Sequence, residues 1–372
     1  MADSHRQKDY GDYFEKLEQR LSGREQPAPA RPKAAPVPAK KSRRFRVIRI
    51  RPIALFGLLF LVLLSVVLIP LLSALKGETK ATAPSPAQAQ TSSLPKESNP
   101  AAPSVTFSET DQTVPAPASN DAESLLMAEI DSGHIVTARN PHKRMSPAST
   151  TKIMTVLTAS DLITDYDDVF EMTIEITDAM YLAEATVAGF SAGERVTVLD
   201  LMYGTILPSG GDAALGLAIK LAGSEAAFAE KMNQKAAALG LTGSHFVNVT
   251  GLYHADHYTT AYDLAVILCE ALKDPVVKKV LSTYRYTTKV TAQHPDGIEL
   301  SATLFDYMYG TEPETATILG GKTGFVNESG YCIASYGANN ATGKEYVAVT
   351  LKNSGRWPAF YGQIDLYKDF AK

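Results

Sequence analysis

A serine and a lysine lie one helical turn apart at residues 149–152, in the sequence Ser-Thr-Thr-Lys. Residues at i and i+3 share one face of a helix, so the Lys152 amine can take the proton of the Ser149 hydroxyl. The amine can act in this way only if burial and neighbouring cations keep it neutral. The spacing therefore predicts an acyl-transfer site with Ser149 as nucleophile and Lys152 as its base.

The same Ser-x-x-Lys pattern occurs at residues 73–76 and 93–96. The first copy falls at the end of a long apolar run, and the second contains Pro95 in a segment too poor in apolar residues to fold. Ser149 instead precedes an apolar-rich run, residues 152–159, which predicts a buried helix able to hold a nucleophile rigidly. The context of the pattern therefore selects Ser149.

Two further motifs follow downstream, Leu-Pro-Ser-Gly-Gly-Asp at 207–212 and Lys-Thr-Gly-Phe at 322–325. The order Ser-x-x-Lys, Ser-x-Asn, Lys-Thr-Gly is typical of penicillin-binding proteins and serine β-lactamases. Gly-Glu-Arg-Val-Thr at 193–197 and His-Tyr-Thr-Thr-Ala at 257–261 extend the likeness. From about residue 123 to its end, the chain resembles the low-molecular-weight serine D-alanyl-D-alanine carboxypeptidases.

The resemblance implies a catalytic role for three residues. Ser149 would attack the carbonyl between two D-alanines and become an acyl-enzyme that water hydrolyses. Lys152 would be the base for acylation, and Ser209 would pass the proton toward the leaving amine. The main-chain N–H groups of Ser149 and Phe325 would form the oxyanion hole.

The resemblance also implies that Lys322, Thr323, Gly324 and Phe325 bind the substrate. Lys322 would raise the positive potential and help to keep the Lys152 amine neutral. Thr323 would hydrogen-bond the substrate carboxylate, and Gly324 would let the substrate approach the strand edge closely.

The second motif departs from the family pattern, because Gly211 occupies the place of the usual Asn. In the family that amide bonds the first-motif lysine and a substrate carbonyl. We therefore expect Gly211 to affect substrate positioning and turnover more than activation of the nucleophile. On this interpretation, restoring Asn at 211 raises peptide turnover more than it raises the rate of penicillin acylation. The alternative interpretation of residues 209–212 is a turn between two helices, with Asp212 capping the second.

The hydrophobic pattern predicts strands at both ends of residues 123–372 and helices in the middle. This pattern indicates an α/β domain with an inserted helical subdomain. The resemblance implies that the domain is of the β-lactamase/transpeptidase type, with an antiparallel sheet flanked by helices. The expected elements are a hairpin over 125–138, helices over 152–159, 198–220, 224–239, 260–272 and 357–370, and strands over 284–291, 318–325, 331–336 and 346–351.

The first 122 residues differ sharply in composition from the rest. Residues 53–75 carry no charged side chain and at 1.5 Å per residue reach about 35 Å, which is enough to cross a bilayer. Seven Lys and Arg precede this run within residues 40–51, which predicts a cytoplasmic N-terminus. We expect a mostly disordered cytoplasmic tail (1–51), a transmembrane helix (52–75), a Pro/Ala/Ser/Thr-rich tether (76–122) and an extracytoplasmic catalytic domain (123–372).

Two alternatives concern this N-terminal part. The small-x-small sequence at 87–89 has the form of a signal-peptidase site, although the preceding segments are long for a signal peptide. Apolar residues also recur at helical spacing within residues 8–22, where they form one narrow stripe. That stripe is a candidate for binding a cytoplasmic partner, and a marginal solvated helix is the alternative.

Composition excludes several other functions. A net charge of -4 gives no reason to expect nucleic acid binding, and neither a zinc-type cluster nor a phosphate-binding glycine loop is present, so no cofactor is expected. Cys269 and Cys332 each lie in an apolar pattern, which favours buried free thiols over a disulfide. His257 is expected to be a structural residue in a turn.

The sequence thus predicts a membrane-anchored serine D,D-carboxypeptidase that trims peptidoglycan stem peptides and is acylated by β-lactams. The alternatives are a β-lactamase and a penicillin-recognising sensor or wall-binding protein with impaired turnover. The rate of deacylation distinguishes the three.

Overall fold

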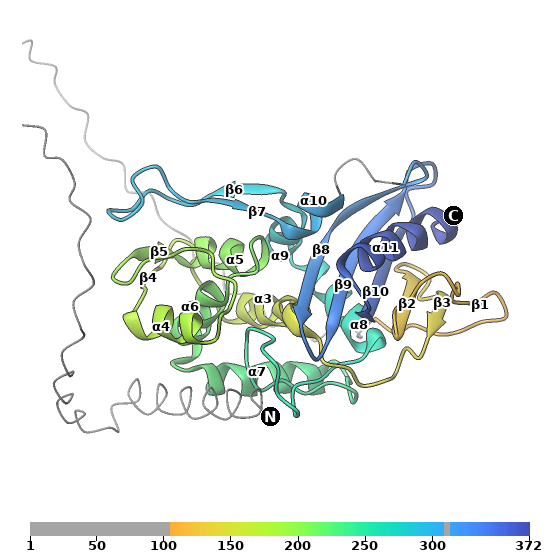
Figure 1. Ribbon diagram of the computed structural model, residues 1–372, viewed down its shortest axis with the longest axis horizontal. Helices are drawn as coiled ribbons and strands as arrows, with labels where there is room; N and C mark the ends of the chain where they lie inside the picture. The colour runs from red at the N-terminus through yellow and green to blue at the C-terminus, as the bar shows by residue number, and fades with distance from the viewer. Residues whose placement is uncertain (1–104, 309–312) are drawn as a thin grey trace, which may run out of the picture. The chain divides into compact units, whose positions relative to one another are not determined.

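The computed structural model describes residues 105–308 and 313–372 (Figure 1). The predicted cytoplasmic tail, the predicted span over 52–75 and the candidate partner segment over 8–22 lie outside these residues. Within the described part, every helix is too short or too polar to cross a bilayer.

A central sheet of six strands organises the described residues, in the order β1-β3-β2-β10-β9-β8 (Figure 1). Its strands are β1 Val114–Pro115, β2 Ser124–Glu129, β3 Ile135–Arg139, β8 Ala316–Val326, β9 Gly330–Asn339 and β10 Glu345–Asn353. Neighbouring strands pair antiparallel except β1 and β3, which run parallel. The sheet is therefore mixed, and the prediction of a purely antiparallel sheet is wrong at this edge.

Side chains of the sheet alternate between two apolar cores. In β2, Leu126 and Ala128 belong to the larger core, whereas Leu125 and Met127 belong to the smaller one. Helix α8 (Ala261–Lys273) packs on one face, against β2, β9 and β10, and helix α11 (Arg356–Phe370) packs on the other. Because successive strand residues point to opposite faces, two covered faces give the continuous apolar runs seen in the sequence.

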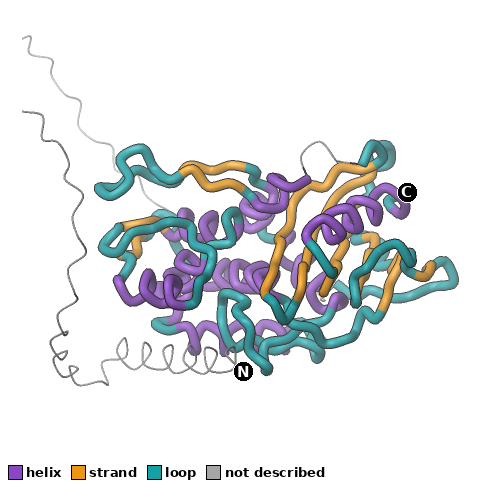
Figure 2. Tube along the Cα trace, viewed as in Figure 1, coloured by secondary structure: helices purple, strands orange, loops and turns teal. Residues whose placement is uncertain are grey.

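The remaining helices form a layer beside the sheet, which Figure 2 shows in purple. Helix α3 (Thr151–Leu162) is its centre and contacts α5, α6, α7 and α8. The other elements of this part are β4 Val169–Glu171, α4 Ile174–Leu182, β5 Arg195–Thr197, α5 Val198–Ile206, α6 Gly211–Ala222, α7 Glu225–Ala238, α9 Pro275–Ser282, β6 Arg285–Thr287, β7 Glu299–Ser301 and α10 Thr303–Met308. Strands β4 and β5 pair with each other, as do β6 and β7.

Most of the predicted elements are confirmed, and the exceptions have local causes. The hairpin over 125–138 forms as β2 and β3, and the C-terminal strands and helix occupy the predicted places. The helical run predicted over 198–220 divides into α5 and α6, because Ser209 adopts a left-handed φ of 69° between them. The strand predicted over 284–291 is shortened to β6, since the chain turns away there into a long loop.

The folded part begins earlier in the chain than predicted. Phe107 is buried, and the hydroxyl of Tyr262 in α8 bonds both its N–H (3.1 Å) and its carbonyl (3.2 Å). The Arg139 guanidinium donates to the carbonyls of Pro117, Asn120 and Ala122. Residues 105–122, assigned from their composition to the tether, are therefore held on the domain by main-chain contacts, which composition does not reveal.

Both cysteines are buried and free, as the apolar pattern around them predicts. Burial raises the pKa of the Cys332 thiol to about 11 and that of the Cys269 thiol to about 12.

Candidate active site

Ser149 lies in a short 3-10 turn, η1 (Ala148–Thr150), immediately before α3. This turn contacts β8, and a Cβ added to Gly324 would lie 2.8 Å from the Ser149 nitrogen. A side chain at 324 would therefore collide with the turn that carries the nucleophile. The structure brings the first and third motifs together at this point, where the start of α3 meets the end of β8 (Figure 1).

Ser149 and Lys152 form the pair predicted from their spacing. The Lys152 amine hydrogen-bonds the Ser149 hydroxyl at 2.9 Å and donates to the Thr250 carbonyl at 2.6 Å. Lys152 is 2% exposed. Burial lowers the pKa of Lys152 to about 7, although the carboxylates of Asp212 and Glu225 act in the opposite direction. A large fraction of the amine is therefore neutral near pH 7, as a general base requires.

Lys322 is buried on β8 and donates to the Thr323 carbonyl at 2.8 Å. Burial, followed by repulsion from Lys152, lowers its pKa well below the usual value. The resemblance implied that Lys322 helps to keep the Lys152 amine neutral. In the structure, the main cause of the lowered pKa of Lys152 is the burial of its own amine.

The other residues of the third motif face different partners. Thr323 Oγ1 lies 3.0 Å from Thr303 Oγ1, and the Thr303 N–H donates to the Leu207 carbonyl at 3.1 Å. Thr303, which sequence reasoning missed, thus links the second motif to the third. Phe325 is 48% exposed, and its ring packs on Tyr331 with 4.4 Å between centroids.

Ser209 is buried between α5 and α6 in a left-handed conformation. Among the described residues, its hydroxyl makes no hydrogen bond to Ser149, Lys152 or Lys322, so the predicted proton path through it stays a prediction. Gly211 begins α6 and donates its N–H to the Thr186 carbonyl at 2.7 Å. A Cβ added to Gly211 would lie 2.5 Å from the sulfur of Met180 in α4.

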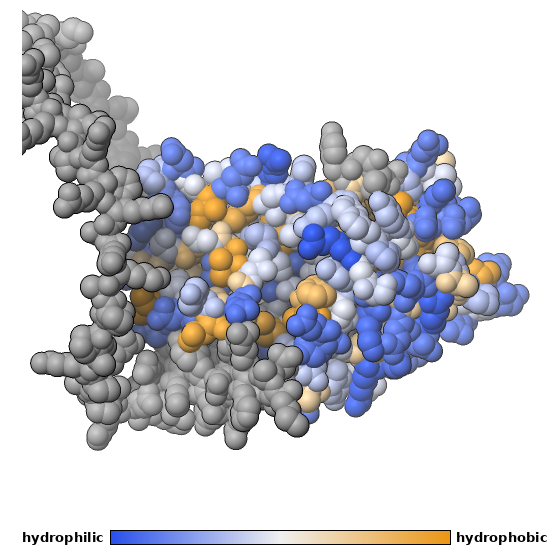
Figure 3. Space-filling view, in the orientation of Figure 1, coloured by the Kyte–Doolittle hydropathy of each residue, from blue (hydrophilic) through white to orange (hydrophobic). Residues whose placement is uncertain are grey.

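Met180 also borders a cavity of about 400 Å³ between α4 and the start of α6. The cavity is lined mainly by apolar side chains, including Ala185, Val187 and Phe190. Figure 3 shows apolar side chains gathered on the part of the surface that carries these helices. The space that an Asn side chain at 211 would need is thus occupied by Met180, which has a cavity beside it.

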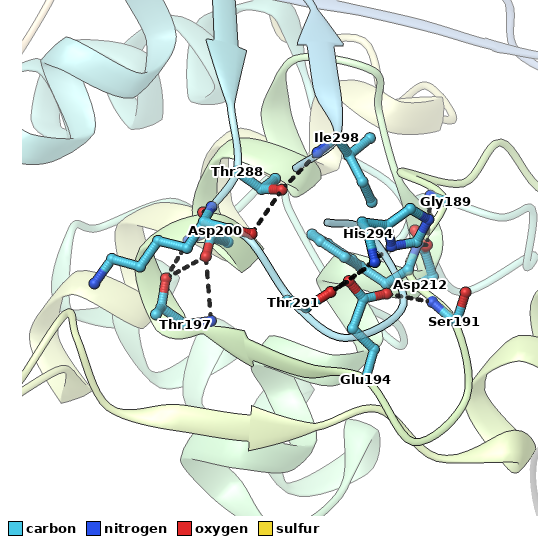
Figure 4. Close-up of polar contacts among 12 residues, drawn as sticks. Gly189, Ser191, Glu194, Thr197, Asp200, Asp212, Thr288, Thr291, His294 and Ile298 are labelled. Atoms are coloured by element: carbon cyan, nitrogen blue, oxygen red, sulfur yellow. Dashed lines mark hydrogen bonds and ion pairs between the residues drawn. The ribbon is translucent and has the colours of Figure 1, made fainter. Parts of the chain in front are cut away.

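Asp212 holds the loop that precedes the second motif (Figure 4). Its carboxylate is buried and accepts from the N–H groups of Ala188, Gly189 and Phe190 at 2.7, 3.0 and 3.3 Å. It also accepts from the N–H of Ala213 at 2.9 Å, within the first turn of α6. The N-cap of α6 is Gly210, so the alternative interpretation of Asp212 as a helix cap is not confirmed. Asp212 instead joins the second-motif helix to the 188–190 loop.

Glu194 and Asp200 anchor the loop between β6 and β7 to the helical layer (Figure 4). Glu194 accepts from the Thr291 hydroxyl at 2.7 Å and from His294 Nδ1 at 2.8 Å. Asp200 accepts from the Tyr286 hydroxyl at 2.8 Å and from the Lys289 N–H at 3.2 Å. The long loop therefore has buried anionic anchors on the layer that carries the second motif.

His257 is the structural residue that the sequence predicts. It is buried, accepts from the Val247 N–H at Nδ1 (3.1 Å) and lies 2.8 Å from the Thr151 hydroxyl at Nε2. Burial lowers its pKa to about 3, so the ring is neutral and Nε2–H donates to Thr151. Within residues 105–308 and 313–372, no group of three or more His, Cys, Asp or Glu is arranged to hold a metal ion.

Residues 110–355 match the peptidase S11 family model, described as D-alanyl-D-alanine carboxypeptidase. The chain is 32% identical over 222 residues to D-alanyl-D-alanine carboxypeptidase DacF of Bacillus subtilis, covering 58% of this chain and 54% of that protein. It is 30% identical over 268 residues to DacD of Escherichia coli, covering 65% of each. The chain thus spans about half the length of the first relative and just under two thirds of the second.

The structure is similar to that of the Streptomyces K15 DD-transpeptidase, with a TM-score of 0.60 and 28% identity over 68% of this chain and 99% of that one. A mutant structure of the same enzyme gives a TM-score of 0.62. The likeness confirms the transpeptidase-like α/β fold predicted from the motifs. Because the family match covers more than half of its 372 residues, this chain belongs to the D-alanyl-D-alanine carboxypeptidase family.

Proposed function

We propose that this protein is a serine D-alanyl-D-alanine carboxypeptidase that removes the terminal D-alanine from peptidoglycan stem peptides and is acylated by β-lactams at the same serine. The observation that carries the proposal is the Ser149–Lys152 pair, in which Ser149 Oγ lies 2.9 Å from Lys152 Nζ. The Lys152 amine is buried, and its pKa is lowered to about 7. Membership of the family supports the substrate class.

In the proposed reaction the neutral Lys152 amine accepts the Ser149 hydroxyl proton while the serine oxygen attacks the penultimate D-alanine carbonyl. The N–H groups of Ser149 and Phe325 donate to the oxygen that becomes negative. When the intermediate collapses, the C–N bond breaks and the leaving amine takes up the proton that Lys152 accepted, passed on through Ser209. Water then cleaves the Ser149 ester and releases the shortened peptide.

Lys322 and Thr323 would bind the carboxylate of the terminal D-alanine. If the Thr303 hydroxyl donates to Thr323 Oγ1, the Thr323 proton is left for the carboxylate. An approaching carboxylate would also favour the charged form of the buried Lys322 amine. Substrate binding would thereby restore a positive charge that burial disfavours in the free enzyme.

Mass spectrometry of the full-length chain tests this proposal. Incubation with benzylpenicillin should give one covalent adduct on Ser149, and a peptide ending in D-Ala-D-Ala should lose one alanine. Ser149→Ala should abolish penicillin labelling and reduce the release of alanine by a factor of thousands. The small rate that remains is the catalysis that the binding groups supply without a nucleophile. Ser93→Ala, in another Ser-x-x-Lys sequence of this chain, is the matched control and should retain both activities.

Three outcomes contradict the proposal. Labelling that persists in Ser149→Ala would place the nucleophile elsewhere. Rapid loss of the penicillin adduct without release of alanine would identify a β-lactamase. A stable adduct without release of alanine would identify a penicillin-recognising protein that does not turn over.

We further propose that one membrane span over residues 53–75 anchors the enzyme, with residues 1–51 in the cytoplasm and the catalytic domain outside. The uncharged run and the Lys and Arg that precede it support this topology. Protease added to intact cells should release the catalytic domain and leave the N-terminal segment protected. A soluble product that begins at Gln90 would instead show cleavage after Ala89.

A further inference from the structure

The loop over residues 247–252 supplies a partner that the motifs do not contain. The carbonyl of Thr250 accepts from the Lys152 amine at 2.6 Å and lies 3.4 Å from the Ser149 hydroxyl. Thr250 is 3% exposed, so water does not compete for this carbonyl. One main-chain oxygen thus contacts both members of the acyl-transfer pair.

A single amide side chain folds this loop. Asn248 Oδ1 accepts from the Gly251 N–H at 2.7 Å, and from the N–H and the hydroxyl of Thr250, both at 3.2 Å. Asn248 Nδ2 donates to the Leu252 carbonyl at 2.9 Å. An Asn side chain that bonds main-chain groups two and three residues ahead stabilises a tight turn.

The turn is pressed against the nucleophile. Gly251 has a φ of 82°, and a Cβ added there would lie 1.9 Å from the Ala148 carbonyl oxygen. Thr155 of α3 donates to the Val249 carbonyl at 2.8 Å, and the Val249 N–H donates to Glu225 at 3.0 Å. The loop is therefore fixed against α3 and α7, and the Asn248 amide determines where the Thr250 carbonyl points.

We propose that Asn248 is a positioning residue for acyl transfer, because the turn that it folds holds the Thr250 carbonyl so that the lone pair of the Lys152 amine faces Ser149. A neutral amine has two N–H donors and one lone pair, and a carbonyl can only accept. When the carbonyl takes an N–H, the amine is oriented with its lone pair available to the serine proton. This inference rests on the proposed function.

The same carbonyl also affects the charge of the amine, since its dipole favours the ammonium form. The charged groups that act on the Lys152 amine are Asp212 and Glu225, which raise its pKa. Besides burial, the charge of Lys152 in turn lowers the pKa of Lys322 and of His257. Displacing the carbonyl should therefore lower the pKa of Lys152. A carboxylate at position 248 should raise it, while keeping the acceptor that folds the turn.

The test measures the second-order rate of acylation by benzylpenicillin from about pH 5 to about pH 9 on the full-length chain. In the unmodified chain this rate should rise with pH along an acid limb and then reach a plateau. Asn248→Ala should lower the plateau rate about tenfold and move the acid limb about half a pH unit to lower pH. Asn248→Asp should keep the plateau within about threefold and move the limb to higher pH.

Asn233→Ala is the matched control. Its amide bonds the N–H and carbonyl of Phe246, the residue just before the loop, and among the described residues it makes no hydrogen bond to Thr250 or Lys152. It should lower the melting temperature without moving the acid limb. This separates a positioning role from general loosening of the loop.

An acid limb that stays in place in a folded Asn248→Ala would overturn the inference. If that variant does not fold, a folded Asn248→Asp whose acid limb does not move to higher pH would overturn it, since aspartate keeps the acceptor bonds to Thr250 and Gly251 and loses only the bond to the Leu252 carbonyl. Failure of the unmodified chain to be acylated at any pH would instead contradict the proposed function.

Discussion

Lys152 and Lys322 are both buried, and burial of an amine disfavours its charged form. Lys152 is surrounded by acceptors: the Thr250 carbonyl, the Ser149 hydroxyl and, further away, two carboxylates. The two carboxylates, Asp212 and Glu225, keep the pKa of Lys152 from falling as far as burial alone would take it. The balance leaves a base that is neutral enough to act and basic enough to take a proton.

We predict that acylation of Ser149 rises with pH along a limb centred near pH 7, because the neutral amine is the active form. Lys152→Met should abolish acylation and stabilise the fold by about 2 kcal/mol below pH 7, where the unmodified amine is charged in both folded and unfolded protein. The gain should shrink as the pH rises from 7 to the ordinary value of 10.5. Urea unfolding at several pH values measures it, and destabilisation of Lys152→Met at low pH would contradict the argument.

The structure changes the expectation for Gly211→Asn. The Cβ of the new asparagine would lie 2.5 Å from the Met180 sulfur. The asparagine side chain therefore cannot take its place unless Met180 moves. We predict that Gly211→Asn alone costs about 1–2 kcal/mol of stability and does not raise peptide turnover. The cost is limited because Met180 can shift toward the adjacent cavity.

Gly211→Asn combined with Met180→Ala should raise D-alanine release several-fold, the amount that one hydrogen bond of about 1 kcal/mol supplies. Met180→Ala alone is the control and should only destabilise. The change in free energy of unfolding of the double variant should differ from the sum of the two single changes by about 1 kcal/mol, since the two positions touch. An additive result would show that Met180 does not occupy the place of the amide.

At the scale of elements, the loop between β6 and β7 reaches from the sheet side to the helical layer. Burial alone would raise the pKa of Glu194, but hydrogen bonds from Ser191, Thr291 and His294 outweigh it and leave the pKa below its usual value. Because β7 leads directly into α10, which carries Thr303, these anchors also fix the link between the second and third motifs.

We predict that Glu194→Gln lowers the free energy of unfolding by about 2 kcal/mol at pH 7. A carboxylate with a lowered pKa stabilises the fold above its unfolded value of 4.5 and loses that contribution as the pH falls through the folded value. The difference between variant and unmodified protein should therefore shrink below about pH 4.5. Glu171→Gln, at a carboxylate that is 63% exposed, is the control and should change stability by less than about 0.5 kcal/mol.

Elements with long apolar patterns were predictable from the sequence, and short ones were not. The runs that became β8, β9, β10 and α8 are buried on wide faces, so their patterns are continuous. Strands β4 and β5 have three residues each, too few for an alternation to stand out. Helix α4 leaves Ile174, Tyr181 and Leu182 exposed, so its pattern does not mark a buried face.

At the scale of the whole molecule, the site is assembled from four stretches of chain that include residues 149–152, 207–212, 247–252 and 322–325. Three were predicted because their residue types carry chemistry. The fourth contributes a main-chain carbonyl, which any residue could supply, so side-chain types do not reveal it. Its signal was the Asn three residues before a Gly, which predicts a tight turn but not what the turn faces.

Alkylation of the two buried thiols can measure how the fold opens. With pKa values raised to about 11 and 12, Cys332 in β9 and Cys269 in α8 are protonated and shielded, so an alkylating reagent reaches them only when the fold opens. Both belong to the larger core, which the sheet and the helices share. Equal alkylation rates at the two positions would mean that strand and helix separate in one cooperative event. A faster rate at Cys332 would mean that the strand pairing with β8 loosens first, exposing the third motif while the helices remain folded.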